Sequence, residues 1–415
     1  MDSAKRFPRH TSRRPLIWRS LAAALSLLAF STPAVAQESA TGDAAKVIAE
    51  AQLSFGLRVV KALVDETNGS SDRSIVVSPY SLHAGLSLAQ LGAQGATSKA
   101  LGELLGTGPE ISPGYAELSR TLLAVRGEST VTIASSVWVD QNAGLQPNFP
   151  SRAKSSFDAL VRLVDLSSRK SGDEINSWIA AGTRGIIPRL LPDGLPPGGT
   201  AVLANALYLK STWDRPFERS LTKEGTFFAD GRKEVRVPFL SKEASMSYSE
   251  DGEVQTVGIN LGQGRFSYVV LVPRERVGLK ALSGLVTATR VRGALQSQRT
   301  LVQLKIPKGR FQGRPKLSAV LKELCPLPFG STADFQGMTK SKSAISNVLH
   351  EAVVDMNEDG IEAAAASAVV MVGAAPFGED EPKPVEVVAD RPYAFAVLDR
   401  ESSAPMFLGL VSDPS

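Results

Sequence analysis

The spacing of apolar residues predicts helices in two early parts of the chain. Residues 37–70 carry apolar side chains four positions apart, including Phe55, Val59 and Leu63, which indicates a helix with one buried face. Residues 82–93 are apolar on all sides, so a second helix is expected inside the protein.

Other segments follow the two-residue period of β-strands. Residues 130–140 alternate between apolar and polar side chains, which predicts a strand with one buried face. Residues 202–209 and 266–272 are apolar at both parities, so these strands should be covered on both sides. Asn205 interrupts the first of them and needs a hydrogen-bond partner if it is buried.

The remaining pattern completes one domain. A helix that contains Trp178 is expected early in residues 175–191, and residues 393–399 and 406–411 form a closing strand pair. Because no internal repeat or long linker interrupts the pattern, we predict a single α+β domain over residues 37–415.

Composition narrows the chemistry. The chain has 415 residues, one cysteine and three histidines. Cys325 therefore cannot form an internal disulfide and is expected to be an inert thiol, and His83 is expected to be a core histidine. We expect no metal site and no cofactor.

The first 36 residues are typical of an export signal. A basic region precedes the apolar stretch 21–30, and the small residues 34–36 offer a cleavage site. Arg13 and Arg14 are compatible with the twin-arginine route as well as with general secretion, and an uncleaved N-terminal anchor is the alternative. Export predicts a secreted or periplasmic protein without a stable membrane anchor after cleavage.

Signal removal also changes the charge. The formal net charge falls from +4 to about −1, so the basic character of the whole chain is no sign of nucleic-acid binding, and no nucleic-acid partner is expected. Lys308, Arg310, Arg314 and Lys316 form a local basic group, which could bind a polyanion or simply be a solvated face.

Residues 357–390 stand apart from the rest. One interpretation is an alanine-rich helix followed by a linker. If the stretch is extended instead, Ile361 and every second residue after it form an uncharged face, while Glu362 begins the opposite face. No proline occurs before Pro376, so such a chain could enter the middle of a β-sheet.

Several motifs in this order resemble the serpin family, and the resemblance covers nearly all of residues 37–415. The motifs are Ser78-Pro79-Tyr80-Ser81, Asn205-Ala206-Leu207-Tyr208-Leu209-Lys210, His350-Glu351-Ala352-Val353-Val354 and Asn357-Glu358-Asp359-Gly360-Ile361-Glu362 followed by four alanines. The resemblance implies an α+β serpin fold with a large central mixed β-sheet, about nine helices, further smaller sheets and an exposed reactive-centre loop at about residues 358–390. Together with the export signal it suggests an exported serpin of bacterial type.

The resemblance also implies a function. The protein would be no enzyme but an irreversible, suicide-substrate inhibitor of serine proteases. It would act as a monomer and trap its target protease covalently by inserting the cleaved loop into the main sheet. Counting from Glu358 in the family pattern puts the scissile bond at Ala374–Ala375, which suits elastase-like or subtilisin-like proteases. Met371 or Val372 would be used if the register differs.

The resemblance assigns roles to two further groups of residues. The hinge, where insertion begins, consists of Glu358, Gly360, Ile361, Glu362, Ala363, Ala364, Ala365 and Ala366. Ile361 departs from the Thr or Ser usual in the family, so insertion is expected to be slower. The shutter, a polar cluster beneath the main sheet, consists of Ser78, Ser81, Asn205 and His350.

Two alternatives stay open. A non-inhibitory serpin acting as a binding or structural protein would have the same fold. A serine hydrolase is disfavoured, because the sequence has no Gly-x-Ser-x-Gly motif and only Ser151 and Lys154 offer a Ser-x-x-Lys pair.

Overall fold

The computed structural model describes residues 34–67, 74–108, 112–191, 195, 200–362 and 383–415. Residues 40–415 form one compact unit. No helix among the described residues is both long and apolar enough to cross a membrane.

Nine α-helices occur in the described part of the chain. They are α1 (Ala34–Glu66), α2 (Pro79–Gly92), α3 (Gly95–Leu105), α4 (Ser112–Leu123), α5 (Phe149–Phe157), α6 (Arg169–Gly182), α7 (Leu279–Leu285), α8 (Ala288–Gln296) and α9 (Leu317–Leu324). Helix α2 is buried along most of its length, which confirms the prediction from its uniformly apolar sequence. Ser78 caps it, since its hydroxyl accepts a hydrogen bond from the backbone of Ser81.

The first sheet has nine strands in the order β1-β16-β15-β8-β7-β6-β9-β14, with β5 paired to β6. The strands are β1 (Ile75–Val77), β5 (Lys223–Ala229), β6 (Lys233–Glu250), β7 (Val254–Leu261), β8 (Phe266–Pro273), β9 (Arg299–Pro307), β14 (Val385–Val388), β15 (Tyr393–Asp399) and β16 (Pro405–Val411). All of β8 is buried, and β15 and β16 form the predicted antiparallel closing pair.

The second sheet has seven strands in the order β10-β12-β13-β4-β2-β3, with β11 also paired to β4. The strands are β2 (Thr130–Asp140), β3 (Leu160–Val164), β4 (Ala201–Thr212), β10 (Gly309–Gly313), β11 (Asn347–Leu349), β12 (Ala352–Met356) and β13 (Gly360–Ile361). The sheet is mixed, because β11 is parallel to β4 and β3 is parallel to β2, whereas the other pairs are antiparallel.

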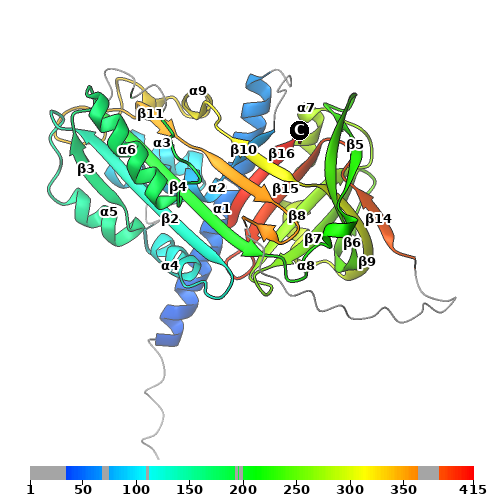
Figure 1. Cartoon of the computed structure of the whole chain (residues 1–415). Helices are drawn as coiled ribbons and strands as arrows, with labels where there is room; N and C mark the ends of the chain where they lie inside the picture. Colours follow the sequence, from blue (N-terminus) through cyan, green and yellow to red (C-terminus); the bar gives the residue numbers. More distant parts are fainter. Residues whose placement is uncertain (1–33, 68–73, 109–111, 192–194, 196–199, 363–382) are drawn as a thin grey trace, which may run out of the picture. The chain divides into compact units, whose positions relative to one another are not determined.

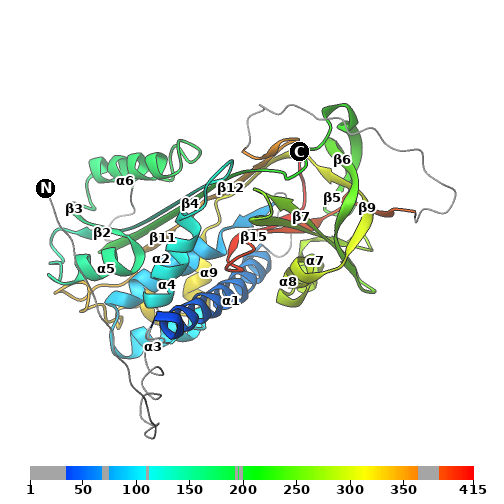
Figure 2. The same cartoon turned by 90° about the horizontal axis from the view of Figure 1, so that it is seen from below.

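Helices cover both faces of the seven-stranded sheet: α6 lies on one side and α2 on the other (Figures 1 and 2). Strand β4 is buried from Ala201 to Leu209, as its sequence predicts. The prediction of a single buried face for residues 130–140 is wrong for the second half of β2. Ser136 and Trp138 are buried there, and Trp138 shares a hydrophobic cluster with Ile175 and Ile179 of α6. Ser136 and Trp138 stand at the parity that the alternating pattern assigns to solvent, so the pattern gave no sign that α6 covers this face.

Candidate functional site: the seam in the seven-stranded sheet

The candidate site is the boundary between β4 and the strands β11 and β12, which we call the seam (Figure 1). At one end, β11 pairs in parallel with residues 202–204 of β4. At the other end, Ile361 of β13 lies between Met356 of β12 and Ser211 of β4. Between these ends, the strand pairs of the described residues give β4 a neighbour only on its β2 side. The seam thus contains the first two residues of an additional strand.

Gly360 allows the chain to enter the seam. A Cβ atom at this position would lie 2.1 Å from the carbonyl oxygen of Ser211 and 2.7 Å from Cα of Thr212. Both are backbone atoms of β4 and cannot move aside, so only glycine permits this close approach. The sequence singled out Gly360 as part of the hinge, and the structure supplies the steric reason.

The chain before Gly360 is held by charged groups. The buried Glu358 carboxylate pairs with Lys308 at 2.9 Å and accepts a hydrogen bond from Thr222 at 3.0 Å. Burial alone would raise the pKa of Glu358, but the bond from Lys308, the backbone and Thr222 hold that pKa below its ordinary value. Asp359 forms an ion pair with Arg219. These contacts fix the point from which the loop departs.

Ile361 is completely buried and belongs to the main hydrophobic core. Its partner Ser211 lies on the same face of β4 as Leu207 and Leu209, which also belong to that core. The uncharged face of the loop therefore points to the core at this residue, as the pattern predicts. Ile361 already occupies the seam, and we still expect it to slow insertion of the residues that follow it.

Glu362 lies on the opposite face, at the position where the described hinge ends. Its backbone N–H donates to the carbonyl of Asp355 at 2.7 Å, and its φ of 50° is left-handed. Partial burial raises the pKa of its carboxyl to about 7; nearby Asp355 adds to the rise, while Tyr208, Arg310 and Lys210 oppose it. The charged form of Glu362 is thus disfavoured where it stands.

The four predicted shutter residues are all buried, and hydrogen bonds among the described residues join Ser78 to Ser81 and to His350 but not to Asn205. The backbone N–H of Ser78 donates to Nε2 of His350 at 3.0 Å, and burial lowers the pKa of His350 to about 3, so its imidazole is neutral. Asn205 instead donates to the hydroxyl of Ser135 on β2 at 2.7 Å. Oδ1 of Asn205 and Nδ1 of His350 have no hydrogen-bond partner in the described part of the chain.

Sequence reasoning missed Ser135, although a signal was present. Ser135 follows Val131 and Ile133 at the same parity, so a hydroxyl stands on a face that is otherwise apolar. A polar residue in such a position requires a buried partner, and Asn205 is directly opposite it in the β2–β4 register.

The family model for serpins, "Serpin (serine protease inhibitor)", matches residues 50–414 of this chain. This chain is a serpin. Serpin-ZXA of Oryza sativa subsp. japonica is 32% identical over 388 residues, which cover 88% of this chain and 96% of the relative. Serpins are protease inhibitors in general and not catalytic enzymes, and the α+β fold described above is the serpin fold.

Solved structures agree with this assignment. The native stressed conformation of AtSerpin1 from Arabidopsis is 27% identical and superimposes with a TM-score of 0.77, covering 88% of this serpin and 98% of that chain. Human thyroxine-binding globulin complexed with thyroxine gives a TM-score of 0.78 at 23% identity, covering 90% of this serpin and all of that chain, which shows the shared fold alone.

Other predicted residues of the serpin fall into three groups. The reactive bond Ala374–Ala375 and the hinge residues 363–366 lie outside the described residues. His83 is a satisfied core histidine, with Tyr115 at 2.5 Å and the carbonyl of Leu105 at 3.0 Å. Burial raises the pKa of the Cys325 thiol, which fits an unreactive side chain.

The local basic group is not a free patch. Lys308 pairs with Glu358 at 2.9 Å and Arg314 with Glu351 at 2.6 Å, while Arg310 lies 3.9 Å from Asp355. Three of its four members are therefore engaged with acidic side chains, which disfavours the polyanion interpretation.

Proposed function

We propose that this serpin is a suicide-substrate inhibitor of serine proteases whose reactive-centre loop, residues 358–390, is cleaved, and that the part of the loop before the cleaved bond then inserts into the seam. The protease serine would attack the carbonyl carbon of Ala374, and the bond to the nitrogen of Ala375 would break. The serine proton would pass to the nitrogen of Ala375, which becomes the free amine at the start of fragment 375–415, while Ala374 stays esterified to the protease. The observation that carries the proposal is the seam itself, with Gly360 and Ile361 already paired at one end.

The strand register supports insertion over the whole length of β4. Gly360 lies opposite Thr212 and Ile361 opposite Ser211. If the loop continues in this antiparallel register, Met371 would lie opposite Ala201, the first residue of β4. Ala374 would then stand about 10 Å beyond the strand end, at ~3.3 Å per residue. The ester-linked protease would be carried past the edge of the sheet, where it is pressed against the serpin body.

The shutter supports the same strand position. In the extended register, Ser367 would lie opposite Asn205, on the core face. Its hydroxyl could donate to the buried Oδ1 of Asn205 or accept from the Nδ1–H of His350, neither of which has a partner in the described residues. Insertion would thus give a hydrogen-bond partner to a buried side-chain atom of the shutter and to the unpaired backbone groups of β4.

Our proposals for the class of target protease and for the location of the serpin rest on the sequence alone. We propose an elastase-like or subtilisin-like target, because Ala374 is small and apolar. We also propose that the serpin is of exported, bacterial type, that residues 1–36 are removed, and that the mature protein is a secreted or periplasmic monomer.

The test is to incubate the mature chain with pancreatic elastase and with subtilisin, followed by denaturing gels and mass spectrometry. Inhibition predicts a covalent band at the summed mass and a released peptide that begins at Ala375. Ala365→Glu places a charge opposite buried Leu207 and should turn the serpin into a substrate. Ala365→Val keeps the same position uncharged, so it is the matched control and should retain inhibition. Cleavage of the unchanged chain without a covalent band would instead indicate a non-inhibitory serpin that acts as a binding protein.

A further inference from the structure

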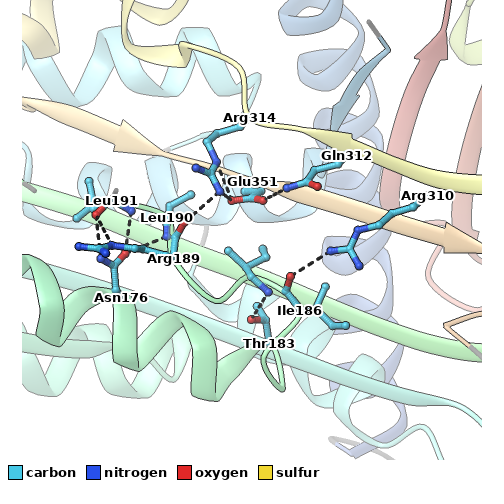
Figure 3. A network of polar contacts seen from close by, with 11 residues as sticks. Asn176, Thr183, Ile186, Arg189, Leu190, Leu191, Arg310, Gln312, Arg314 and Glu351 are labelled. Atoms are coloured by element: carbon cyan, nitrogen blue, oxygen red, sulfur yellow. Dashed lines mark hydrogen bonds and ion pairs between the residues drawn. The ribbon is translucent and has the colours of Figure 1, made fainter. Parts of the chain in front are cut away.

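The segment that follows α6 lies across the seam. We call residues 183–191 the strap; Figure 3 shows it between α6 and the strands β10 and β12. Asn176 of α6 ties the far end of the strap to the helix, because its side chain accepts from the N–H groups of Leu190 and Leu191 at 2.9 and 2.8 Å and donates to the carbonyl of Leu191 at 2.9 Å. Helix α6 and the strap are therefore joined into one piece at both ends of the strap.

Helix α6 anchors this piece on the β4 side of the seam, because it packs on β4 and β2. The buried cluster of the strap itself spans the seam: Ile187, Leu190 and Leu191 lie with Val202 and the two alanines that follow it at the same parity in β4, and with Val353 of β12. On the other side of the helix, Glu174 of α6 pairs with Arg162 of β3.

Two arginines on or next to β10 also connect the strap to the β12 side of the seam (Figure 3). Arg310 of β10 donates to the carbonyl of Ile186 at 3.3 Å, and Arg314 donates to the carbonyl of Arg189 at 3.0 Å. Both acceptors are backbone atoms of the strap, and both donors are attached to the strand that pairs with β12.

Glu351 holds Arg314 in the position that reaches the strap. The Glu351 side chain is 1% exposed and pairs with Arg314 at 2.6 Å, with Gln312 as a second hydrogen-bond donor. A guanidinium can serve a carboxylate and a carbonyl at the same time, because its N–H groups point in several fixed directions. The buried Glu351 carboxylate therefore accounts for the orientation of Arg314.

We propose that Arg310 and Arg314, the latter positioned by Glu351, hold the strap across the closed seam and set the rate at which the sheet opens for the loop. A new strand between β4 and β12 moves them apart by about a further 4.8 Å, the spacing of neighbouring strands. Two hydrogen bonds of about 3 Å cannot span that additional distance, so both must break before the loop enters. This inference rests on the proposed insertion of the loop.

The rate matters because insertion competes with release of the protease. The ester between Ala374 and the protease is hydrolysed if the loop enters too slowly, and the serpin is then consumed as a substrate. Loss of the strap contacts would speed trapping, but it would also permit premature entry of the uncleaved loop. The two arginines thus balance efficiency of inhibition against persistence of the active form.

The experiment measures entry of a strand without any protease. A fluorescent synthetic peptide with the sequence of residues 363–374 is incubated with the mature protein, and its incorporation is followed on native gels. Arg314→Lys keeps a positive charge beside Glu351 but loses the guanidinium N–H group that donates to the strap carbonyl of Arg189. Arg310→Ala is the second variant; this side chain is 44% exposed, so its removal leaves the core intact. Arg290→Lys is the matched control, because Arg290 also bridges carboxylates and a carbonyl, that of Leu285, but lies on α8.

We expect each strap variant to incorporate the peptide about tenfold faster than the unchanged protein. The Arg290 variant should incorporate it at the unchanged rate, even if it lowers the unfolding temperature. Unchanged protein that incorporates the peptide, with strap variants no faster than it, would overturn the strap proposal while leaving inhibition intact. If neither the unchanged protein nor any variant takes up the peptide, and loop cleavage raises no unfolding temperature, the proposed function fails and the strap proposal fails with it.

Discussion

Shortening Ile361 should release the hinge from the seam. Ile361→Ala removes three carbons from a side chain that is completely buried, at ~0.8 kcal/mol per carbon, or about 2.4 kcal/mol. In an expelled hinge this side chain would be in water, so the loss falls on the seated state alone. Because 1.4 kcal/mol corresponds to tenfold, the expelled fraction should rise roughly 50-fold. Ile361→Val removes one carbon and should raise it about fourfold.

Hydrogen exchange at the Glu362 amide is the appropriate assay, since this N–H donates to the carbonyl of Asp355 at 2.7 Å only while the hinge is seated. The exchange rate of this amide should increase from the unchanged protein to Ile361→Val and again to Ile361→Ala. Amides of β8, which is buried throughout, serve as the internal control and should not change. Equal exchange at Glu362 in all three proteins would refute the reasoning, because it would mean that the burial of Ile361 does not hold the hinge.

Three further outcomes follow from the same region. Lys308→Met leaves the buried Glu358 carboxylate with only the more distant Arg219, at 4.0 Å, and should cost about 2–3 kcal/mol in urea unfolding. Adding Glu358→Gln should recover part of this cost, and an unchanged midpoint would contradict the prediction. The pKa of Glu362 is about 7 in the seated hinge and 4.5 in solvent, so protonation stabilises the seat below about pH 4.5, and this contribution is lost as pH rises through 7. Glu362→Gln should abolish that pH dependence of hinge exchange; a profile that persists would assign it elsewhere. Asn205→Ala and Ser135→Ala should each lower native stability by about 1–2 kcal/mol, and the double variant by less than the sum; strict additivity in thermal unfolding would exclude their coupling.

Much of the fold could be predicted because burial leaves a local pattern. The continuous apolar runs of α2, β4 and β8 determined where these elements lie and that both sides of them are covered. The second half of β2 escaped prediction because Ser136 and Trp138 read as the polar parity of a one-sided strand. Trp138 donates to the Ser136 hydroxyl at 2.9 Å, so polar atoms on that face satisfy each other under α6, and no local pattern records such a pairing.

The site was predictable in part for a similar reason. The hinge and the shutter residues lie within motifs, and the alternation of charge places Ile361 and Glu362 on opposite faces. Strand β13 has only two residues, which is too short for an alternating hydrophobic pattern. The sequence therefore could not predict that these residues already occupy one end of the seam. The strap contacts were also hidden: Arg314 and its acceptor are 125 residues apart, and a backbone carbonyl is the same whatever residue carries it.

The open edge of β4 has a consequence for how the protein behaves in bulk. The unpaired N–H and C=O groups of this edge can form backbone hydrogen bonds with any strand of suitable length. The edge therefore does not discriminate between the loop of its own molecule and the loop of a neighbouring molecule. The loop is covalently connected to the same chain as the sheet, so its effective concentration at the edge of β4 is in the millimolar range. In dilute solution this favours insertion within one molecule. At high concentration or on warming, one molecule could donate its loop to the next in a head-to-tail contact that does not close. Whether a preparation stays as separate molecules would therefore depend on its concentration and thermal history.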